Sequence, residues 1–160
     1  MYEFSIDSAA PKAELYRELL QSADALTAGE RDGVANMANV AALLWEYLPD
    51  VNWTGFYRVV GDELVLGPFQ GKAACIRISL GEGVCGTAAA SGETQRVDDV
   101  HSFPGHIACD AGSASELVVP VKRDGKVIAV IDLDSPSTMR FDADDAAGIE
   151  ALAAILSNRI

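Results

Sequence analysis

ELVVPVKRDGKVIAVIDLD, residues 116–134, is the stretch from which the fold of this chain is best reconstructed. Two β-rich runs, 116–122 and 126–134, flank an Arg-Asp-Gly turn, so the stretch predicts a β-hairpin. Alternation divides the second run between two faces, with Val127, Ala129, Ile131 and Leu133 on one and Ile128, Val130, Asp132 and Asp134 on the other. Both faces are apolar until the two aspartates. We therefore expect this strand to be covered on both sides and central in a sheet.

Two helices are expected ahead of the sheet. Pro11 is suited to the first turn of a helix that ends near Gly29, and Asp32 is suited to cap a second helix that Pro49 stops. The second helix has an apolar stripe, made of Val34, Met37, Ala41, Leu44 and Leu48. Helices with such a stripe pack against a sheet or against each other.

Short β-rich runs and one short helix follow. Runs 52–60 and 63–70 flank a Gly-Asp turn and predict another hairpin, and two weaker strands are expected at 75–79 and 94–97. The glycine- and alanine-rich stretch 81–92 reads as a turn and a short helix that carries Cys85. The long irregular segment that follows it has the character of a functional loop.

A helix closes the chain, with Asp142 and Asp145 as its expected capping box. The sum is an α+β domain: a mostly antiparallel sheet of about six strands with helices packed on it. At 160 residues the chain has the size of one domain, 1–160, with N-terminal helices in 1–50, the sheet and active-site loops in 51–140 and the C-terminal helix in 141–160.

The composition narrows the choice of partners. The chain has 12 basic and 24 acidic residues, a formal charge of −12, which disfavours nucleic acid and anionic membrane surfaces. It has neither the pattern of a signal peptide nor an apolar run long enough to span a bilayer. We expect a cytoplasmic protein, in which thiols stay reduced and a disulfide is more often catalytic than structural.

Three carboxylates are expected to meet at one edge of the sheet. Asp132 and Asp134 share a strand face, and pairing of the hairpin brings Glu116 close to both. Solvation at the strand ends is the simplest interpretation. Two functional interpretations stand beside it: binding of a cationic group such as an ammonium, or proton donation by a carboxyl whose pKa is raised by burial and by its neighbours. We assign no metal ligands.

Trp53 and Tyr57 lie four residues apart on an expected strand, and so on one face with Gly55 between them. Core packing is one interpretation of the two aromatic residues. The other is a recess above Gly55 whose aromatic walls suit a methyl or sulfonium-like group.

The three cysteines, Cys75, Cys85 and Cys109, contain no CxxC pair, and their odd number fits poorly with a secreted disulfide framework. They are either inert buried thiols or a redox set. Cys75 fits both interpretations equally, whereas Cys109 lies in a loop three residues after His106, which favours an exposed and functional thiol. A structural zinc site that uses the cysteines and His106 is a rival interpretation.

Five segments together resemble one family. They are NWTGFY (52–57), GKAACIRI (71–78), GEGVCGTAAASGE (81–93), DVHSFPGHIACDAGSASELVVPV (99–121) and VIAVIDLDSP (127–136). They resemble the free methionine-(R)-sulfoxide reductases, which are single-domain members of the GAF superfamily, from about Pro11 to the C-terminus. A GAF-like fold alone would say little about function, because that fold also serves sensors.

The resemblance implies roles for particular residues. Cys109 is implied as the nucleophile that attacks the sulfur of free L-methionine (R)-sulfoxide and becomes a sulfenic acid, with Cys75 as the thiol that resolves it to a disulfide. Cys85 is implied to assist recycling or to contact substrate. The residues implied to bind the substrate are Glu116, Asp132, Asp134, Trp53 and Tyr57.

The resemblance also implies the partners. No cofactor is expected, since thioredoxin supplies the electrons, and a homodimer is one assembly open to the chain. The alternative from another class is a GAF sensor that binds a small molecule without catalysis. A carboxylate-lined pocket in a chain of charge −12 disfavours an anionic nucleotide as the ligand of such a sensor.

Overall fold

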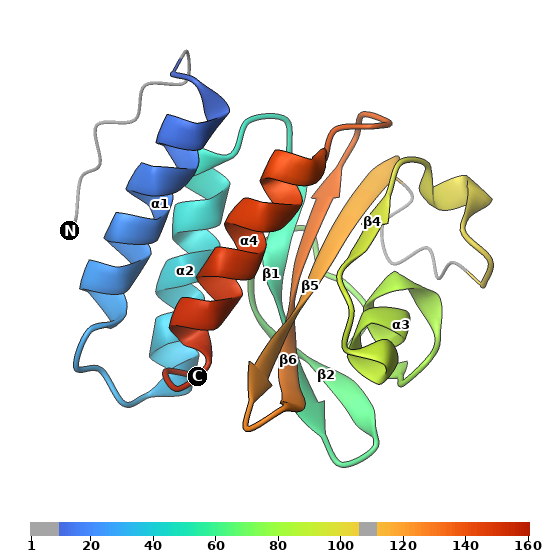
Figure 1. Ribbon diagram of the computed structural model, residues 1–160. Coiled ribbons are helices and arrows are strands. Elements are labelled where there is room, and N and C mark those ends of the chain that lie inside the picture. Colours follow the sequence, from blue (N-terminus) through green and yellow to red (C-terminus); the bar gives the residue numbers. More distant parts are fainter. Residues whose placement is uncertain (1–9, 106–111) are drawn as a thin grey trace.

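The computed structural model describes residues 10–105 and 112–160 and has an α+β architecture (Figure 1). A six-stranded sheet in the order β3-β2-β1-β6-β5-β4 forms the middle layer, and each pair of neighbouring strands is antiparallel. The strands are β1 (Trp53–Val60), β2 (Glu63–Gly71), β3 (Arg77–Ser79), β4 (Gln95–Val97), β5 (Ser115–Arg123) and β6 (Lys126–Ser135). The fold class predicted from the sequence is confirmed.

The hairpin of β5 and β6 lies where the sequence predicts it. Arg123 pairs with Lys126 across a two-residue turn, and both turn residues, Asp124 and Gly125, have positive φ angles, of 51° and 76°. This turn geometry matches the twist of antiparallel strands. β6 lies between β1 and β5, so the prediction of a central strand is confirmed.

The predicted alternation along β6 is wrong at its first residues. The register shifts between Val121 and Lys122 of β5, where Val121 pairs with Ala129 and Lys122 with Val127. Ile128 is therefore the extra residue of a β-bulge, and the alternation reverses there. Val127 packs on the face opposite to Ala129, and Ile128 joins the face of Ala129.

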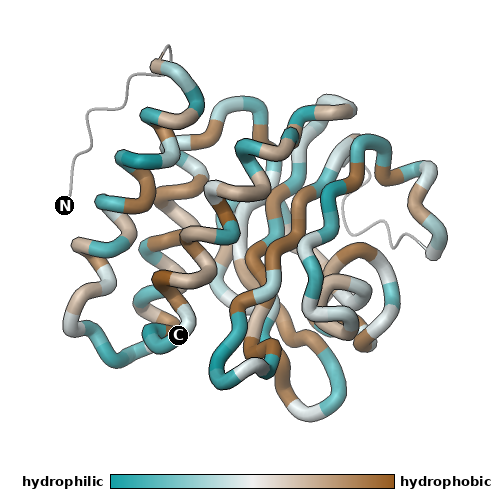
Figure 2. Tube along the Cα trace, in the orientation of Figure 1, coloured by the Kyte–Doolittle hydropathy of each residue, from teal (hydrophilic) through white to brown (hydrophobic). Residues whose placement is uncertain are grey.

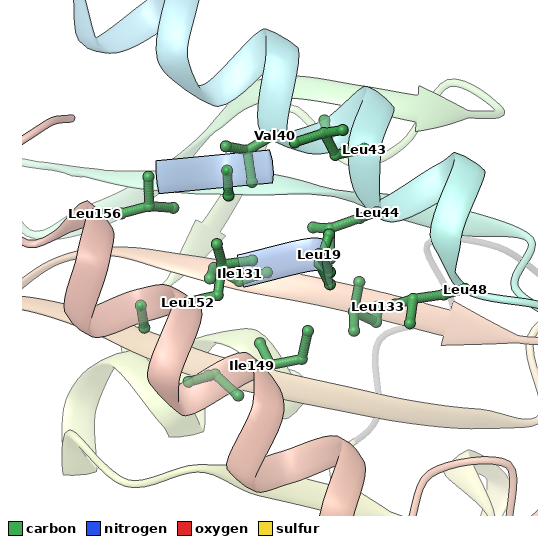
Figure 3. Packing of buried hydrophobic residues seen from close by; sticks show 14 of the residues in the cluster. Leu19, Val40, Leu43, Leu44, Leu48, Ile131, Leu133, Ile149, Leu152 and Leu156 are labelled. Carbon is green, nitrogen blue, oxygen red and sulfur yellow. The ribbon is translucent and has the colours of Figure 1, made fainter. Parts of the chain in front are cut away.

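Three helices, α1 (Lys12–Thr27), α2 (Gly33–Tyr47) and α4 (Ala143–Leu156), cover one face of the sheet (Figure 1). In Figure 3, leucines of α1, α2 and α4 surround Ile131 and Leu133 of β6. Hydrophilic residues gather at the hairpin turns and on outer parts of the helices (Figure 2). This layer is the larger apolar core of the molecule.

Local signals define the helix ends. The Asp32 side chain accepts hydrogen bonds from the backbone N–H groups of Val34 and Ala35, and Asp142 and Asp145 form the predicted capping box. The predicted stripe of α2 is buried except for Val34, which is 54% exposed because it lies in the first turn, beyond the edge of the core.

The opposite face of the sheet has a thinner cover. It consists of α3 (Gly83–Ser91), which lies across the sheet from α1, α2 and α4 in Figure 1, and of the segments around it, including the 3-10 helix η1 (Val100–Ser102). Gly86 of α3 approaches β3 so closely that a Cβ atom would collide with the Ser79 carbonyl oxygen. α3 therefore packs tightly against the strands and encloses a cavity beside Cys85.

Within the described part of the chain, every helix is too short or too polar to cross a membrane.

Candidate active site

The sheet register brings the three predicted carboxylates together. Glu116 pairs directly with Asp134 across β5 and β6, and Asp132 lies two residues along the same face of β6. Glu116 is 8% exposed and Asp132 6% exposed, whereas Asp134 is half-buried. Solvation at the strand ends is therefore the wrong interpretation for Glu116 and Asp132.

Cys85 of α3 faces the two buried carboxylates. Its Sγ lies 3.9 Å from Glu116 Oε1, and one donor atom each from Cys85, Glu116 and Asp132 lie within 4.8 Å of one another. Asp132 Oδ1 has no hydrogen-bond partner. No ion pair among the described residues neutralises Glu116 or Asp132, so an acidic, desolvated cluster faces the cavity.

The surroundings favour the protonated form of all three groups. Burial, together with the neighbouring Asp132 and Asp134, raises the pKa of Glu116 well above its usual value. Burial raises the pKa of Asp132 to about 7, and burial beside the carboxylates raises the pKa of the Cys85 thiol. Near neutral pH the cluster therefore holds protons that it can give to a bound molecule.

Trp53 and Tyr57 form an aromatic wall of the cavity. Their rings stack with centroids 5.9 Å apart, and Trp53 stacks on Phe69 of β2 at 5.2 Å. The predicted recess above Gly55 is wrong, because a Cβ atom there would lie 2.7 Å from Trp53 Cη2 and 2.8 Å from Phe69 Cα. The missing side chain of Gly55 instead lets the Trp53 ring lie flat beside β2.

Both aromatic residues also hold the segment after β2. The Trp53 indole Nε1–H donates to the Lys72 carbonyl at 3.0 Å, and the Tyr57 hydroxyl donates to the Cys75 carbonyl at 3.0 Å. Residues 72–74 line the cavity, and the two hydrogen bonds hold this segment at Lys72 and at Cys75. Tyr57 thus joins the aromatic wall to Cys75 directly.

The cavity brings together six of the residues singled out from the sequence: Trp53, Tyr57, Cys85, Glu116, Asp132 and Asp134. The sequence analysis missed further lining residues, among which are Lys72, Glu82 and Ser113. All three lie within segments of the resemblance, and Lys72 and Glu82 each lie three residues before a cysteine, Cys75 and Cys85.

The cysteines differ in state. Cys75 is half-buried and disulfide-bonded, whereas Cys85 is a buried free thiol. Cys109 and His106 lie outside the described residues, and so do the predictions that concern them.

Comparisons with known proteins agree with the fold. The profile of the GAF domain family matches residues 13–160. A protein of Escherichia coli named free methionine-R-sulfoxide reductase is 52% identical over 145 residues, which are 91% of this chain and 88% of that protein. The protein of the same name from Saccharomyces cerevisiae is 45% identical over 154 residues, 91% of this chain and 86% of that protein.

A solved structure has the same fold and a high sequence identity. The free methionine-R-sulfoxide reductase of Neisseria meningitidis, in complex with its substrate, superposes with a TM-score of 0.94 at 48% identity. The match covers 99% of this chain and 95% of that one.

Proposed function

The chain belongs to the GAF domain family and to its free methionine-R-sulfoxide reductases, and we propose that it reduces free methionine (R)-sulfoxide to methionine. The observation that carries this proposal is the acidic cluster of buried Glu116 and Asp132 with half-buried Asp134, beside the aromatic wall of Trp53 and Tyr57. A sulfoxide amino acid has an ammonium group for the first and a methyl group for the second.

Selectivity for the free amino acid follows from charge. The α-ammonium of free methionine sulfoxide would compensate Glu116 and Asp132, which no ion pair among the described residues neutralises. A methionine sulfoxide within a peptide has an amide there instead, and leaves the acidic cluster uncompensated. The cavity therefore favours the free amino acid over the peptide-bound residue.

The first chemical step needs a soft nucleophile at sulfur and a proton at oxygen. In our proposal the Cys109 thiolate attacks the sulfoxide sulfur to form an S–S bond, and a carboxyl group of raised pKa protonates the oxygen. The hydroxyl then passes from the substrate sulfur to the Cys109 sulfur as the S–O and S–S bonds break. Methionine leaves with the electron pair of the S–S bond, and Cys109 becomes a sulfenic acid. Glu116 and Asp132 are the proton donors that burial favours.

The second step forms a disulfide and water. The Cys75 thiol attacks the sulfenic sulfur of Cys109, and the oxygen leaves with the thiol proton as water. Cys75 is disulfide-bonded and Cys85 is free, which supports Cys75 and Cys109 as the pair, since the chain has three cysteines. The dithiol of thioredoxin, our proposed cytoplasmic reductant, then reduces this disulfide and becomes oxidised.

A single-turnover assay tests the proposal. Reduced protein is mixed with free methionine (R)-sulfoxide, and methionine and lost thiols are both counted. We expect about one methionine and two lost thiols per chain. Cys109→Ser should form no methionine, while Cys85→Ser, a matched loss of one thiol, should still form it.

Two outcomes would contradict the proposal in different ways. Binding of the sulfoxide without any methionine would favour the sensor alternative. Methionine formation by Cys109→Ser would move the nucleophile to another residue.

A further inference from the structure

We propose that the thiol of Cys85 and the carboxylates of Glu116 and Asp132 form a Zn²⁺ site, and that Zn²⁺ bound there excludes the substrate. The metal site stands on the described geometry alone, whereas the exclusion of substrate rests on the proposed function. It differs from the structural zinc site considered from the sequence, because it uses neither Cys75 nor Cys109.

The three donors have nearly the spacing that zinc requires. With Zn–S of about 2.3 Å and Zn–O of about 2.1 Å, tetrahedral ligands lie roughly 3.6 Å apart. Cys85 Sγ and Glu116 Oε1 are 3.9 Å apart, and the widest pair of the three is within 4.8 Å. Side-chain rotations that close the widest pair by roughly 1 Å would complete the site.

A second observation points to a missing ligand. Asp132 is 6% exposed and lines the cavity, yet its Oδ1 has no hydrogen-bond partner. A buried carboxylate oxygen without a partner destabilises the folded protein, and a bound cation would offset this destabilisation. The substrate ammonium is one such cation, but it would leave the Cys85 thiol as a hydrogen-bond donor to Glu116, whereas zinc would also bind the sulfur as a ligand.

The donor types select the metal. One thiolate and two carboxylates suit Zn²⁺, which accepts both sulfur and oxygen ligands and is often held by three side chains with one open position. Mg²⁺ and Ca²⁺ take six or more oxygen ligands and do not favour sulfur. The fourth position would face the cavity, where water or an amino acid carboxylate completes the tetrahedron.

The consequence for the enzyme is competition. Glu116 and Asp132 cannot bind the α-ammonium of the substrate and a zinc ion together, because both ligands need the same oxygens. Zinc at this site would therefore raise the apparent KM for free methionine sulfoxide, and a chelator would reverse the effect. The site would make the reductase sensitive to the free zinc concentration.

The direct test uses Cys75→Ser/Cys109→Ser, in which Cys85 is the sole cysteine and no disulfide chemistry remains. Cd²⁺ replaces Zn²⁺ as the probe, because cadmium–thiolate bonds absorb in the ultraviolet. We expect a charge-transfer band that saturates at one Cd²⁺ per chain, and that Zn²⁺ removes by displacement.

Variants of the ligands locate the site. In the same background, Cys85→Ala should lose the band, and Glu116→Gln or Asp132→Asn should weaken Cd²⁺ binding by at least about 10-fold to 100-fold. Glu82→Gln is the matched control, because Glu82 is an exposed carboxylate of the same cavity, outside the cluster; it should change binding less than twofold.

Two results would overturn the metal site. One is the absence of the charge-transfer band in folded protein at tenfold excess Cd²⁺. The other is a band that Glu116→Gln and Asp132→Asn leave unchanged. Circular dichroism establishes folding. If Cys75→Ser/Cys109→Ser fails to fold, the same Cd²⁺ titration is done on oxidised wild-type protein, in which a thiol titration confirms that Cys85 is free. The presence or absence of the band then decides the metal site in the same way.

Turnover measured with and without Zn²⁺ tests whether bound zinc excludes the substrate. We expect Zn²⁺ to inhibit the wild-type protein competitively. Zn²⁺ should inhibit Cys85→Ser less, so that the ratio of the rate without zinc to the rate with zinc is smaller in this variant. Both results would support exclusion of the substrate. Tight Cd²⁺ binding without zinc inhibition would overturn the exclusion alone. Cd²⁺ binding in a protein that never forms methionine would instead refute the proposed function and leave the site intact.

Discussion

Asp145 in the helical layer and Asp132 in the cavity are both buried carboxylates, but they differ in how far neighbouring groups satisfy their charge and hydrogen bonds. Asp145 is fully buried and accepts hydrogen bonds from Lys12 Nζ at 2.8 Å, the Tyr16 hydroxyl at 2.8 Å and Arg140 at 3.2 Å. Asp132 has no ion pair among the described residues and keeps one oxygen without a partner.

The difference separates stability from function. A buried carboxylate that its neighbours satisfy joins elements together, here the beginnings of α1 and α4. A buried carboxylate that they leave unsatisfied destabilises the empty protein and retains its capacity to bind or protonate a ligand. Matched substitutions in the two layers test this contrast.

The largest effect is expected for Asp145→Asn. It removes the negative charge that faces Lys12 and Arg140, so the free energy of unfolding should fall by about 3–5 kcal/mol. Urea unfolding at pH 7 measures the loss. The kcat/KM of the folded fraction should stay within about threefold of wild type, and a larger loss would mean that the helical layer also shapes the site.

Asp132→Asn should raise the free energy of unfolding rather than lower it, and the size of the gain should depend on pH. The pKa of Asp132 is about 7 in the folded protein, above its ordinary value of 3.8, so the folded state holds the proton more tightly than the unfolded chain. The associated stability is present below about pH 4 and is lost as the pH rises to 7. Asn does not titrate and should avoid that loss.

Relative to wild type, Asp132→Asn should therefore gain on the order of 2 kcal/mol in unfolding free energy between pH 5 and pH 8. Urea unfolding at the two pH values checks this gain. Substrate turnover should fall in the same variant. An equal stability difference at both pH values would contradict the raised pKa.

Two glycines allow a smaller comparison of the layers. A Cβ at Gly148 of α4 would lie 2.6 Å from Tyr16 Cε1, and one at Gly55 would lie 2.7 Å from Trp53 Cη2. Gly148→Ala and Gly55→Ala should each reduce unfolding free energy by about 1–2 kcal/mol through overpacking. Thermal unfolding measures both losses.

Substrate kinetics distinguish the two alanine variants. Only Gly55→Ala should raise KM, since it displaces a ring of the aromatic wall. A raised KM in Gly148→Ala as well would show that the two layers are coupled.

The smallest effect concerns the Tyr57 hydroxyl, which donates to the Cys75 carbonyl. Tyr57→Phe keeps the ring and removes this hydrogen bond, worth about 1 kcal/mol. We expect disulfide formation to slow by roughly fivefold, with a smaller change in methionine formation. Rapid-quench counts of methionine and of thiols separate the two steps, and equal slowing of both would place the hydroxyl in substrate binding instead.

Local patterns account for most of what the sequence predicts correctly. Asp32 and the Asp142 capping box define helix starts within one turn, and the Asp-Gly turn defines the central hairpin. These signals act over a few residues, so the chain reveals them without its fold. The β-bulge at Ile128 left no local signal, because it depends on how β5 and β6 align.

The candidate site was predictable in part. Pairing of one hairpin was enough to bring Glu116 to Asp134 and close to Asp132. The position of Cys85 against these carboxylates required the docking of α3 on the sheet, which sequence spacing does not specify. The filling of the space above Gly55 likewise depended on Phe69, a residue of the neighbouring strand.

The sequence by itself determined the element order, the central strand and the kinds of chemistry available, because periodicity, caps and residue types are properties of short segments. Only the tertiary structure decided that one buried carboxylate is satisfied and another is not. That distinction depends on which cations and hydrogen-bond donors lie within about 3 Å after segments distant along the chain have packed together. Asp145 lies next to Lys12 and Arg140, whereas Asp132 lies next to a thiol, a second carboxylate and a cavity.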